Sequence, residues 1–196
     1  MIKQCTLLSI LIFLLTSCGE EQPVEVEEMV APMKVMPKGF TQKIVKNQYS
    51  IYIPNYLQET TSLSEDASFQ AVNAAKEIYT VVIDEPIDDF VEYYWDLGIY
   101  DHSKTELQNY RESQLAYFVK SGELIKKGEI IEKSFGDKYG ELTYVISKVD
   151  DVDIYYAIGF VQGKDTFYYI FAWTLNEQQD AYRQDLFNII KSFREE

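Results

Sequence analysis

Thiols and imidazoles are nearly absent from this sequence. The chain of 196 residues contains two cysteines, Cys5 and Cys18, and a single histidine, His102. Both cysteines lie near the N-terminus, so the remaining chain cannot build a disulfide framework, a cysteine metal site or a cysteine nucleophile. A lone histidine also argues against structural zinc, and no cofactor is expected. We expect His102 to be a solvated loop residue, because triad members adjacent in the chain cannot normally form the catalytic geometry.

Positive charge is scarce as well. The sequence has 18 Lys and Arg against 32 Asp and Glu, which gives a formal net charge of −14. Such a chain repels phosphate backbones, and no Lys/Arg cluster interrupts the pattern, so nucleic acid is not an expected partner. The same charge disfavours docking onto anionic lipid headgroups, and membrane attachment therefore needs another source.

Apolar residues, in contrast, are plentiful enough to fill a core. Hydrophobic residues make up 46% of the chain, and 16 Tyr and 11 Phe are too many for a disordered protein. The length suits one globular domain with a tail, and we predict that this domain occupies residues 46–196.

The first 18 residues have the pattern of an export signal. Lys3 gives a short positive region, and an apolar run from Leu7 to Leu15 comes after it. This run is too short for a membrane-spanning helix, which needs about 20 residues. An ordinary secretory signal or an N-terminal membrane anchor would share these features.

The end of the apolar run resembles the lipobox of bacterial lipoproteins. An aliphatic residue and two small residues precede a cysteine in the motif Leu15-Thr16-Ser17-Cys18. The resemblance implies a signal peptide over residues 1–17 and a membrane anchor of acyl chains, palmitate among them, on Cys18. Buried acyl chains stabilise such an anchor by about 0.8 kcal/mol per methylene.

The segment after Cys18 has no helical or strand period. Its first residues, Gly19-Glu20-Glu21, resemble the surface-export signal of Bacteroidota lipoproteins, which implies display at the cell surface; an outer-membrane lipoprotein facing the periplasm is the alternative. Pro23, Pro32 and Pro37 interrupt the rest of the segment. We therefore predict a flexible acidic tether over residues 18–45.

Strand and helix patterns alternate through the domain. Strands are predicted at residues 49–54, 69–72, 78–83, 130–135, 141–149, 154–161 and 166–174. Helices are predicted after Pro86, with Asp84 or Glu85 as the cap, and after a capping box at Ser103 and Glu106. A last helix is predicted over residues 177–194, with Asn176 as its cap and a buried stripe that includes Leu186 and Ile190. Gly163 is expected to supply a positive φ in the last hairpin.

The last strands are apolar on both faces. In residues 166–174, Phe167 and Tyr169 alternate with Tyr168 and Ile170, and residues 154–161 show the same pattern. A sheet with one wet face would instead alternate apolar with polar residues. We therefore predict an α+β protein in which helices cover both faces, an α/β/α sandwich around a mainly antiparallel sheet.

This order of elements is similar to that of the PsbP subunit of photosystem II. A helical middle and a β-meander come after the short motif Tyr49-Ser50-Ile51-Tyr52-Ile53-Pro54. The last predicted helix then contains the motif Ile189-Ile190-Lys191-Ser192-Phe193-Arg194. The resemblance spans about residues 45–196 and implies a PsbP-like fold, whose members act mainly as binding or assembly modules. Because a fold does not define chemistry, no functional residue is carried over.

Two groups of residues are candidate sites. Asp150, Asp151 and Asp153 in a predicted turn could supply oxygens to calcium, although the Gly of an EF-hand loop is missing and Asp is common in turns. Tyr93, Tyr94 and Trp95 are consecutive on a short helix, so they cannot all face the core. At least one should be exposed, where an aromatic ring can anchor a protein or a glycan.

The sequence therefore favours a non-catalytic binding or assembly module, anchored by lipid in the cell envelope and engaging an envelope protein or glycan. A hydrolase of envelope polysaccharide is the first alternative, and it requires two carboxylates roughly 5–10 Å apart in a cleft. A calcium-binding module is the second.

Overall fold

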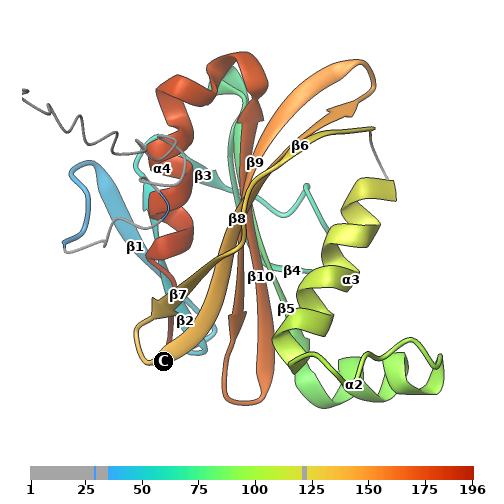
Figure 1. Ribbon diagram of the computed structural model, residues 1–196. Coiled ribbons are helices and arrows are strands. Elements are labelled where there is room, and N and C mark those ends of the chain that lie inside the picture. The colour runs from blue at the N-terminus through green and yellow to red at the C-terminus, as the bar shows by residue number, and fades with distance from the viewer. Residues whose placement is uncertain (1–28, 30–34, 121–122) are drawn as a thin grey trace, which may run out of the picture.

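A computed structural model describes residue 29, residues 35–120 and residues 123–196 (Figure 1). The predicted signal peptide, the lipobox with Cys18 and the acidic pair after it lie outside these residues. The strands are β1 (Phe40–Val45), β2 (Tyr49–Pro54), β3 (Gln58–Glu59), β4 (Ala67–Asn73), β5 (Ile78–Pro86), β6 (Glu123–Lys127), β7 (Ile131–Phe135), β8 (Lys138–Val149), β9 (Val152–Gln162), β10 (Thr166–Leu175) and β11 (Arg194–Glu195). The helices are α2 (Ile87–Asp96), α3 (Glu106–Lys120) and α4 (Gln179–Lys191), with short 3₁₀ turns at Ala74–Lys76 and Asn176–Gln178.

An eight-stranded sheet forms the centre of the molecule. Its strand order is β3-β4-β5-β10-β9-β8-β6, and β7 pairs with the remaining part of β8. Every pairing between described strands of this sheet is antiparallel, and the predicted meander β8-β9-β10 is confirmed.

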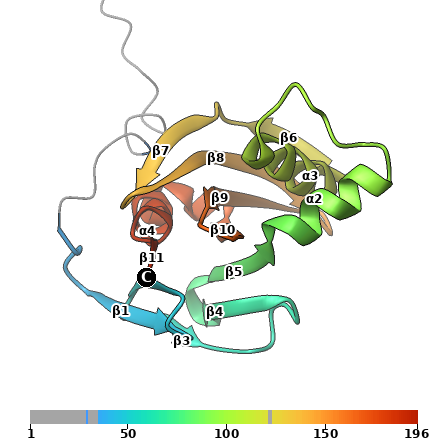
Figure 2. The ribbon, with the colours of Figure 1, turned by 90° about the horizontal axis from the view of Figure 1, so that it is seen from below.

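Helices cover both faces of this sheet, as the alternating apolar pattern predicts. Tyr168 and Ile170 of β10 belong to a core under α4, whereas Phe167 and Tyr169 belong to a second core under α2 and α3. Figure 2 shows α4 on one side of the strands β8, β9 and β10 and the pair α2 and α3 on the other. The α/β/α sandwich is therefore confirmed, and its physical cause is that neither face of β9 or β10 can be left in water.

Contact between α4 and the sheet depends on a glycine. A Cβ added to Gly159 of β9 would lie 2.3 Å from Cγ2 of Ile190 and 3.4 Å from Cδ2 of Leu142. The absence of a side chain at residue 159 therefore lets the helix approach the strand, and the fully buried Leu186 and Phe187 fill the same interface.

The C-terminal region differs from the prediction in three ways. The helix α4 begins at Gln179 after a 3₁₀ turn, and Asn176 does not cap it, since no side chain caps this helix. The helix also ends at Lys191 rather than at Arg194. The last residues form β11 instead, which pairs with β2 and completes a small sheet of order β1-β2-β11.

The predicted boundary at residue 46 also needs correction. Strand β1 begins at Phe40, inside the segment that the sequence predicts to be a flexible tether, and pairs with β2 over its whole length. Phe40 and Val45 are buried at its two ends. The sequence pattern misses this strand because its intervening residues are polar or exposed, so only pairing with β2 defines it.

The residues that begin α2 and α3 differ by a few positions from those that the sequence predicts. Pro86 itself precedes the first turn of α2, and Asp84 and Glu85 remain in β5 rather than capping the helix. The capping box of α3 is formed by Thr105 and Gln108, not by Ser103 and Glu106: the Gln108 amide donates to Thr105 Oγ1 at 3.2 Å, and the Thr105 amide donates to Gln108 Oε1 at 3.0 Å.

Candidate functional site

The three consecutive aromatic residues of α2 divide between core and solvent. Tyr94 stacks on the buried Phe90, with ring centroids 4.3 Å apart. Tyr93 and Trp95 instead expose 61% and 58% of their surfaces. The expectation that at least one of these aromatic residues is exposed is therefore confirmed, and its cause is the helical period, which places only one residue of three consecutive positions on the buried face.

Two aliphatic residues extend this exposed surface beyond the helix. Leu97 and Ile99 expose 53% and 58% of their surfaces directly after α2. We call Tyr93, Trp95, Leu97 and Ile99 the α2 patch. Large apolar side chains scattered singly on a surface are ordinary, whereas four within seven residues form a group that is typical of binding sites.

The chain folds back at the end of α2, which keeps the patch compact. Gly98 has a φ of +67°, a left-handed conformation that glycine adopts without steric cost. This turn lets the amides of Ile99 and Tyr100 both donate to the Tyr94 carbonyl, at 3.1 and 3.2 Å. The patch therefore has a defined backbone rather than a loose loop.

Aromatic contacts hold the central residue of the patch. The ring of His102 contacts the ring of Trp95 edge-on, with ring centroids 4.5 Å apart. The ring of Tyr100 stacks on Trp95, with ring centroids 6.2 Å apart. The position of His102 in an exposed loop between two helices agrees with the sequence prediction. Its contact with Trp95 is a role that the sequence does not reveal.

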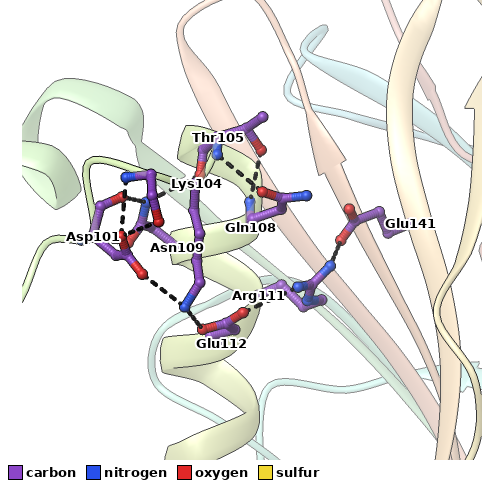
Figure 3. Close-up of polar contacts among 9 residues, drawn as sticks. Asp101, Lys104, Thr105, Gln108, Asn109, Arg111, Glu112 and Glu141 are labelled. Carbon is purple, nitrogen blue, oxygen red and sulfur yellow. Dashed lines mark hydrogen bonds and ion pairs between the residues drawn. The ribbon is translucent and has the colours of Figure 1, made fainter.

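A network of polar contacts fixes the loop that carries His102 (Figure 3). Asp101 accepts hydrogen bonds from the amide and hydroxyl of Ser103, at 2.9 and 2.6 Å. Its second carboxylate oxygen lies 3.0 Å from Nζ of Lys104. These donors to the ionised form, those of Ser103 above all, hold the pKa of Asp101 well below its usual value. The side chain of Asn109 on α3 binds the backbone of the same loop. Its Oδ1 accepts from the Asp101 amide at 2.9 Å, and its Nδ2 donates to the Asp101 carbonyl at 3.0 Å.

The same network continues along α3 to the central sheet. Lys104 donates to Glu112 at 2.7 Å, and its hydrogen bonds to the carboxylates of Glu112 and Asp101 raise the pKa of Lys104. Glu112 lies 3.3 Å from Nη2 of Arg111, whose Nη1 binds Oε2 of Glu141 at 2.6 Å. Because the Glu141 side chain is only 2% exposed, this last ion pair ties α3 to β8 inside the fold. The α2 patch is thus supported by a rigid element, which lowers the entropic cost of binding.

The helix that carries the patch is acidic. Asp88, Asp89, Glu92 and Asp96 are exposed on α2, and no Lys or Arg occurs between residues 77 and 103. The helix therefore combines exposed apolar side chains with exposed negative charge, which favours a partner with apolar and basic groups.

The three aspartates proposed for calcium lie at the hairpin between β8 and β9. Asp150 and Asp151 have φ values of +47° and +65°, as a two-residue turn of this hairpin requires. This turn, and not Gly163, supplies the left-handed residues of the meander. Asp153 lies 4.0 Å from Nζ of Lys148. Within the described residues, no three His, Cys, Asp or Glu side chains gather as metal ligands, and turn geometry by itself accounts for Asp150 and Asp151.

A hollow at one end of the sheet is lined by carboxylates. Asp151, Asp153 and Glu177 border its volume of about 380 Å³, and all three are exposed. A general acid of a glycosidase is kept protonated by burial. Because the three carboxylates of this hollow are exposed, the hollow does not favour the hydrolase alternative. Burial and the neighbouring Asp89 raise the pKa of Glu85, which does not line the hollow.

Comparisons with known proteins define the class of fold. The chain has the mixed α/β fold of PsbP: the solution structure of cyanobacterial PsbP (CyanoP) from Synechocystis sp. PCC 6803 superposes with a TM-score of 0.52 over 85% of this chain and 98% of that one, at 12% sequence identity. A crystal structure from Bacteroides thetaiotaomicron VPI-5482 is less similar, with a TM-score of 0.46 over 81% of this chain and 49% of that one, at 8% identity. No protein-family model and no curated protein matches the sequence. At such low identity the likeness concerns the fold alone.

Several residues of the candidate site are not evident from the sequence. Arg111 and Glu141 are 30 positions apart and meet only because α3 packs on the central sheet. Leu97 and Ile99 flank Gly98, and the helical spacing of the preceding apolar residues does not assign them to core or solvent. Besides the three consecutive aromatic residues, the absence of Lys and Arg over residues 77–103 is a sequence signal that marks this region as unusual.

Proposed function

We propose that the protein is a lipid-anchored, non-catalytic binding or assembly module of the cell envelope, and that the α2 patch is its binding surface. The observation that carries this proposal is the group of four exposed apolar side chains on α2 and on the turn after it. Among the described residues, no helix combines the length and apolar character needed to cross a bilayer. The anchor in this proposal is the acyl group on Cys18, in the outer membrane.

The chemistry of the patch favours a protein partner over a glycan. A sugar binds the flat face of an aromatic ring while polar groups bond to its hydroxyls. Leu97 and Ile99 offer aliphatic surface instead, which apolar side chains of a protein cover better than a sugar does. Exposed acids on α2 would steer a basic partner, and they would repel anionic lipid. We therefore infer an envelope protein with an apolar groove bordered by Lys or Arg.

The position of the patch suits this role. In both views β1, which comes after the proposed tether, lies on one side of the domain, and α2 lies on the opposite side (Figures 1 and 2). A partner bound at α2 would therefore not compete for space with β1, the first strand after the proposed tether.

Replacing single residues of the α2 patch should abolish partner capture without unfolding the domain. We expect Trp95→Ala and Ile99→Ser each to weaken binding at least about tenfold, because exposed anchors at the centre of an interface dominate its energy. The matched control is Ile44→Ser on β1, since Ile44 is 64% exposed and Ile99 58%. The measurement is pull-down from native membranes with the mature protein, followed by titration of the captured protein.

The variants separate the possible outcomes of this experiment. Equal capture by the wild-type protein, Trp95→Ala and Ile99→Ser would refute the proposed surface. Patch-dependent capture of a polysaccharide instead of a protein would refute the protein partner. Capture that is lost in Ile99→Ser, kept in Ile44→Ser and weakened by salt is the supporting result.

Cys18→Ser tests the anchor separately. Without the sulfur that accepts the lipid, the protein should move from the membrane fraction to the soluble fraction. Its melting temperature should not change, because residue 18 precedes the folded domain. A variant that stays in the membrane fraction would contradict lipid attachment at Cys18, whatever the α2 patch binds.

A further inference from the structure

One face of the small sheet β1-β2-β11 carries polar side chains that line a hollow. Gln42 of β1 pairs with Tyr52 of β2, and Ser50 of β2 pairs with Arg194 of β11. Since Ser50 and Tyr52 are two positions apart on one strand, all four side chains lie on the same face of this sheet. They border a hollow of about 230 Å³.

This hollow offers hydrogen-bond donors and no acid. None of the described residues that line it is Asp or Glu, although the chain has 32 acidic residues. Ser50 is only 4% exposed, and its hydroxyl has no hydrogen-bond partner in the described part of the chain. A hydroxyl that lines a hollow in this way can donate to an acceptor that enters it.

Arg194 gives the hollow a positive charge that no carboxylate of the described residues neutralises. Its Nη1 donates to the backbone carbonyls of Lys191, at 2.9 Å, and of Phe193. Glu195, the next residue, lies on the opposite face of β11. Lys133 of β7 is a second cation in this region, because burial and the charge of Arg194 lower the pKa of Lys133. In a chain with a net charge of −14, such a site favours an anion.

We propose that this hollow binds a small carboxylate, whose two oxygens accept from the guanidinium of Arg194 and the hydroxyl of Ser50. The planar guanidinium matches the geometry of a carboxylate, and the Tyr52 hydroxyl is a further donor. Val35 and Met36 add apolar surface to the border, which a short aliphatic chain on the carboxylate can contact. The hollow is smaller than the roughly 300–1,000 Å³ of sites for drug-sized molecules, so the ligand is small.

This site is separate from the α2 patch. In both views the strand β1 lies on the side of the domain opposite α2 (Figures 1 and 2). A carboxylate bound beside β1 would therefore leave the α2 patch open to a partner, and the proposal does not depend on the function of that patch.

Titration with sodium butyrate tests the site on the mature chain carrying Cys18→Ser, at constant ionic strength. In two-dimensional NMR spectra, butyrate should shift the amide signals of Ser50, Tyr52 and Arg194. The dissociation constant should be on the order of 1 mM, because a single ion pair open to water binds weakly. Inorganic phosphate should bind several-fold more weakly, since it has no aliphatic chain to contact Val35 and Met36.

Variants then identify the groups that bind butyrate. Arg194→Gln should weaken binding at least about tenfold, because it removes the charge. Ser50→Ala should weaken it about fivefold, because it removes one donor, and this variant still tests the site if Arg194→Gln does not fold. Lys148→Gln is the matched control: it removes an equal charge from a lysine that does not line the hollow, and should leave binding unchanged.

Three results would overturn the proposal. The first is that 50 mM butyrate leaves these amide signals in place. The second is that phosphate binds as tightly as butyrate. The third is that Ser50→Ala or Arg194→Gln weakens binding no more than Lys148→Gln does.

Discussion

Arg111→Met should lower the free energy of unfolding by about 3–5 kcal/mol, since it leaves a buried carboxylate without its counter-charge. The Glu141 side chain is 2% exposed and that of Arg111 is 13% exposed, so water cannot replace the guanidinium. The hydroxyl of Tyr139, 3.4 Å from the other Glu141 oxygen, is too distant to compensate. Urea unfolding followed by circular dichroism measures the change.

Two further variants show whether burial causes this loss. Lys104→Met removes a cation from the exposed part of the same network, where water screens the charges, and should cost much less stability than Arg111→Met. The double variant Arg111→Met/Glu141→Leu replaces both charges by apolar groups and should recover most of the stability lost in the single variant. If Arg111→Met costs no more than Lys104→Met, the buried ion pair does not tie α3 to the sheet.

Gly159→Val should destabilise the protein by about 3 kcal/mol, because it forces α4 away from β9. The first added carbon would lie 2.3 Å from Cγ2 of Ile190, which is well inside contact distance. The surrounding core is closed, since Leu142 and Ile190 are both fully buried. Thermal unfolding and urea titration of the purified protein measure the effect.

A double-mutant cycle identifies the contact responsible. Ile190→Ala removes the methyl group that the new side chain would meet, so Gly159→Val/Ile190→Ala should be less destabilised than the sum of the single variants. Strict additivity would show that the strain arises elsewhere.

Much of the sheet could be predicted from alternation along single strands. Phe167 and Tyr169 face one core while Tyr168 and Ile170 face the other, as their positions in β10 require. This information is local, because the alternation of apolar and polar residues within one strand indicates whether one or both of its faces are buried. The last helix could be predicted for the same reason, although its ends could not. No side chain caps its start at Gln179, and the backbone amide of Ser192 closes its end after Lys191.

The α2 patch could be predicted only in part. Three successive aromatic residues guarantee that at least one is exposed, but the sequence does not say which of Tyr93, Tyr94 and Trp95 packs on Phe90. Leu97 and Ile99 became part of the surface only through the reversal at Gly98. The support under this surface depends on Arg111 meeting Glu141, which no local pattern encodes.

The sequence by itself determined the small number of thiols, the negative charge, the lipobox-like motif and the two-sided apolar strands, because composition and period are properties of neighbouring residues. Tertiary structure alone decided that β1 joins the domain, that β11 replaces the end of a helix, and that Arg111 is buried against Glu141. It also decided that Ser50 and Arg194 share a face, since cross-strand pairing is defined against the partner strand. These features arise from contacts between distant parts of the chain, whose free energy does not depend on any single segment.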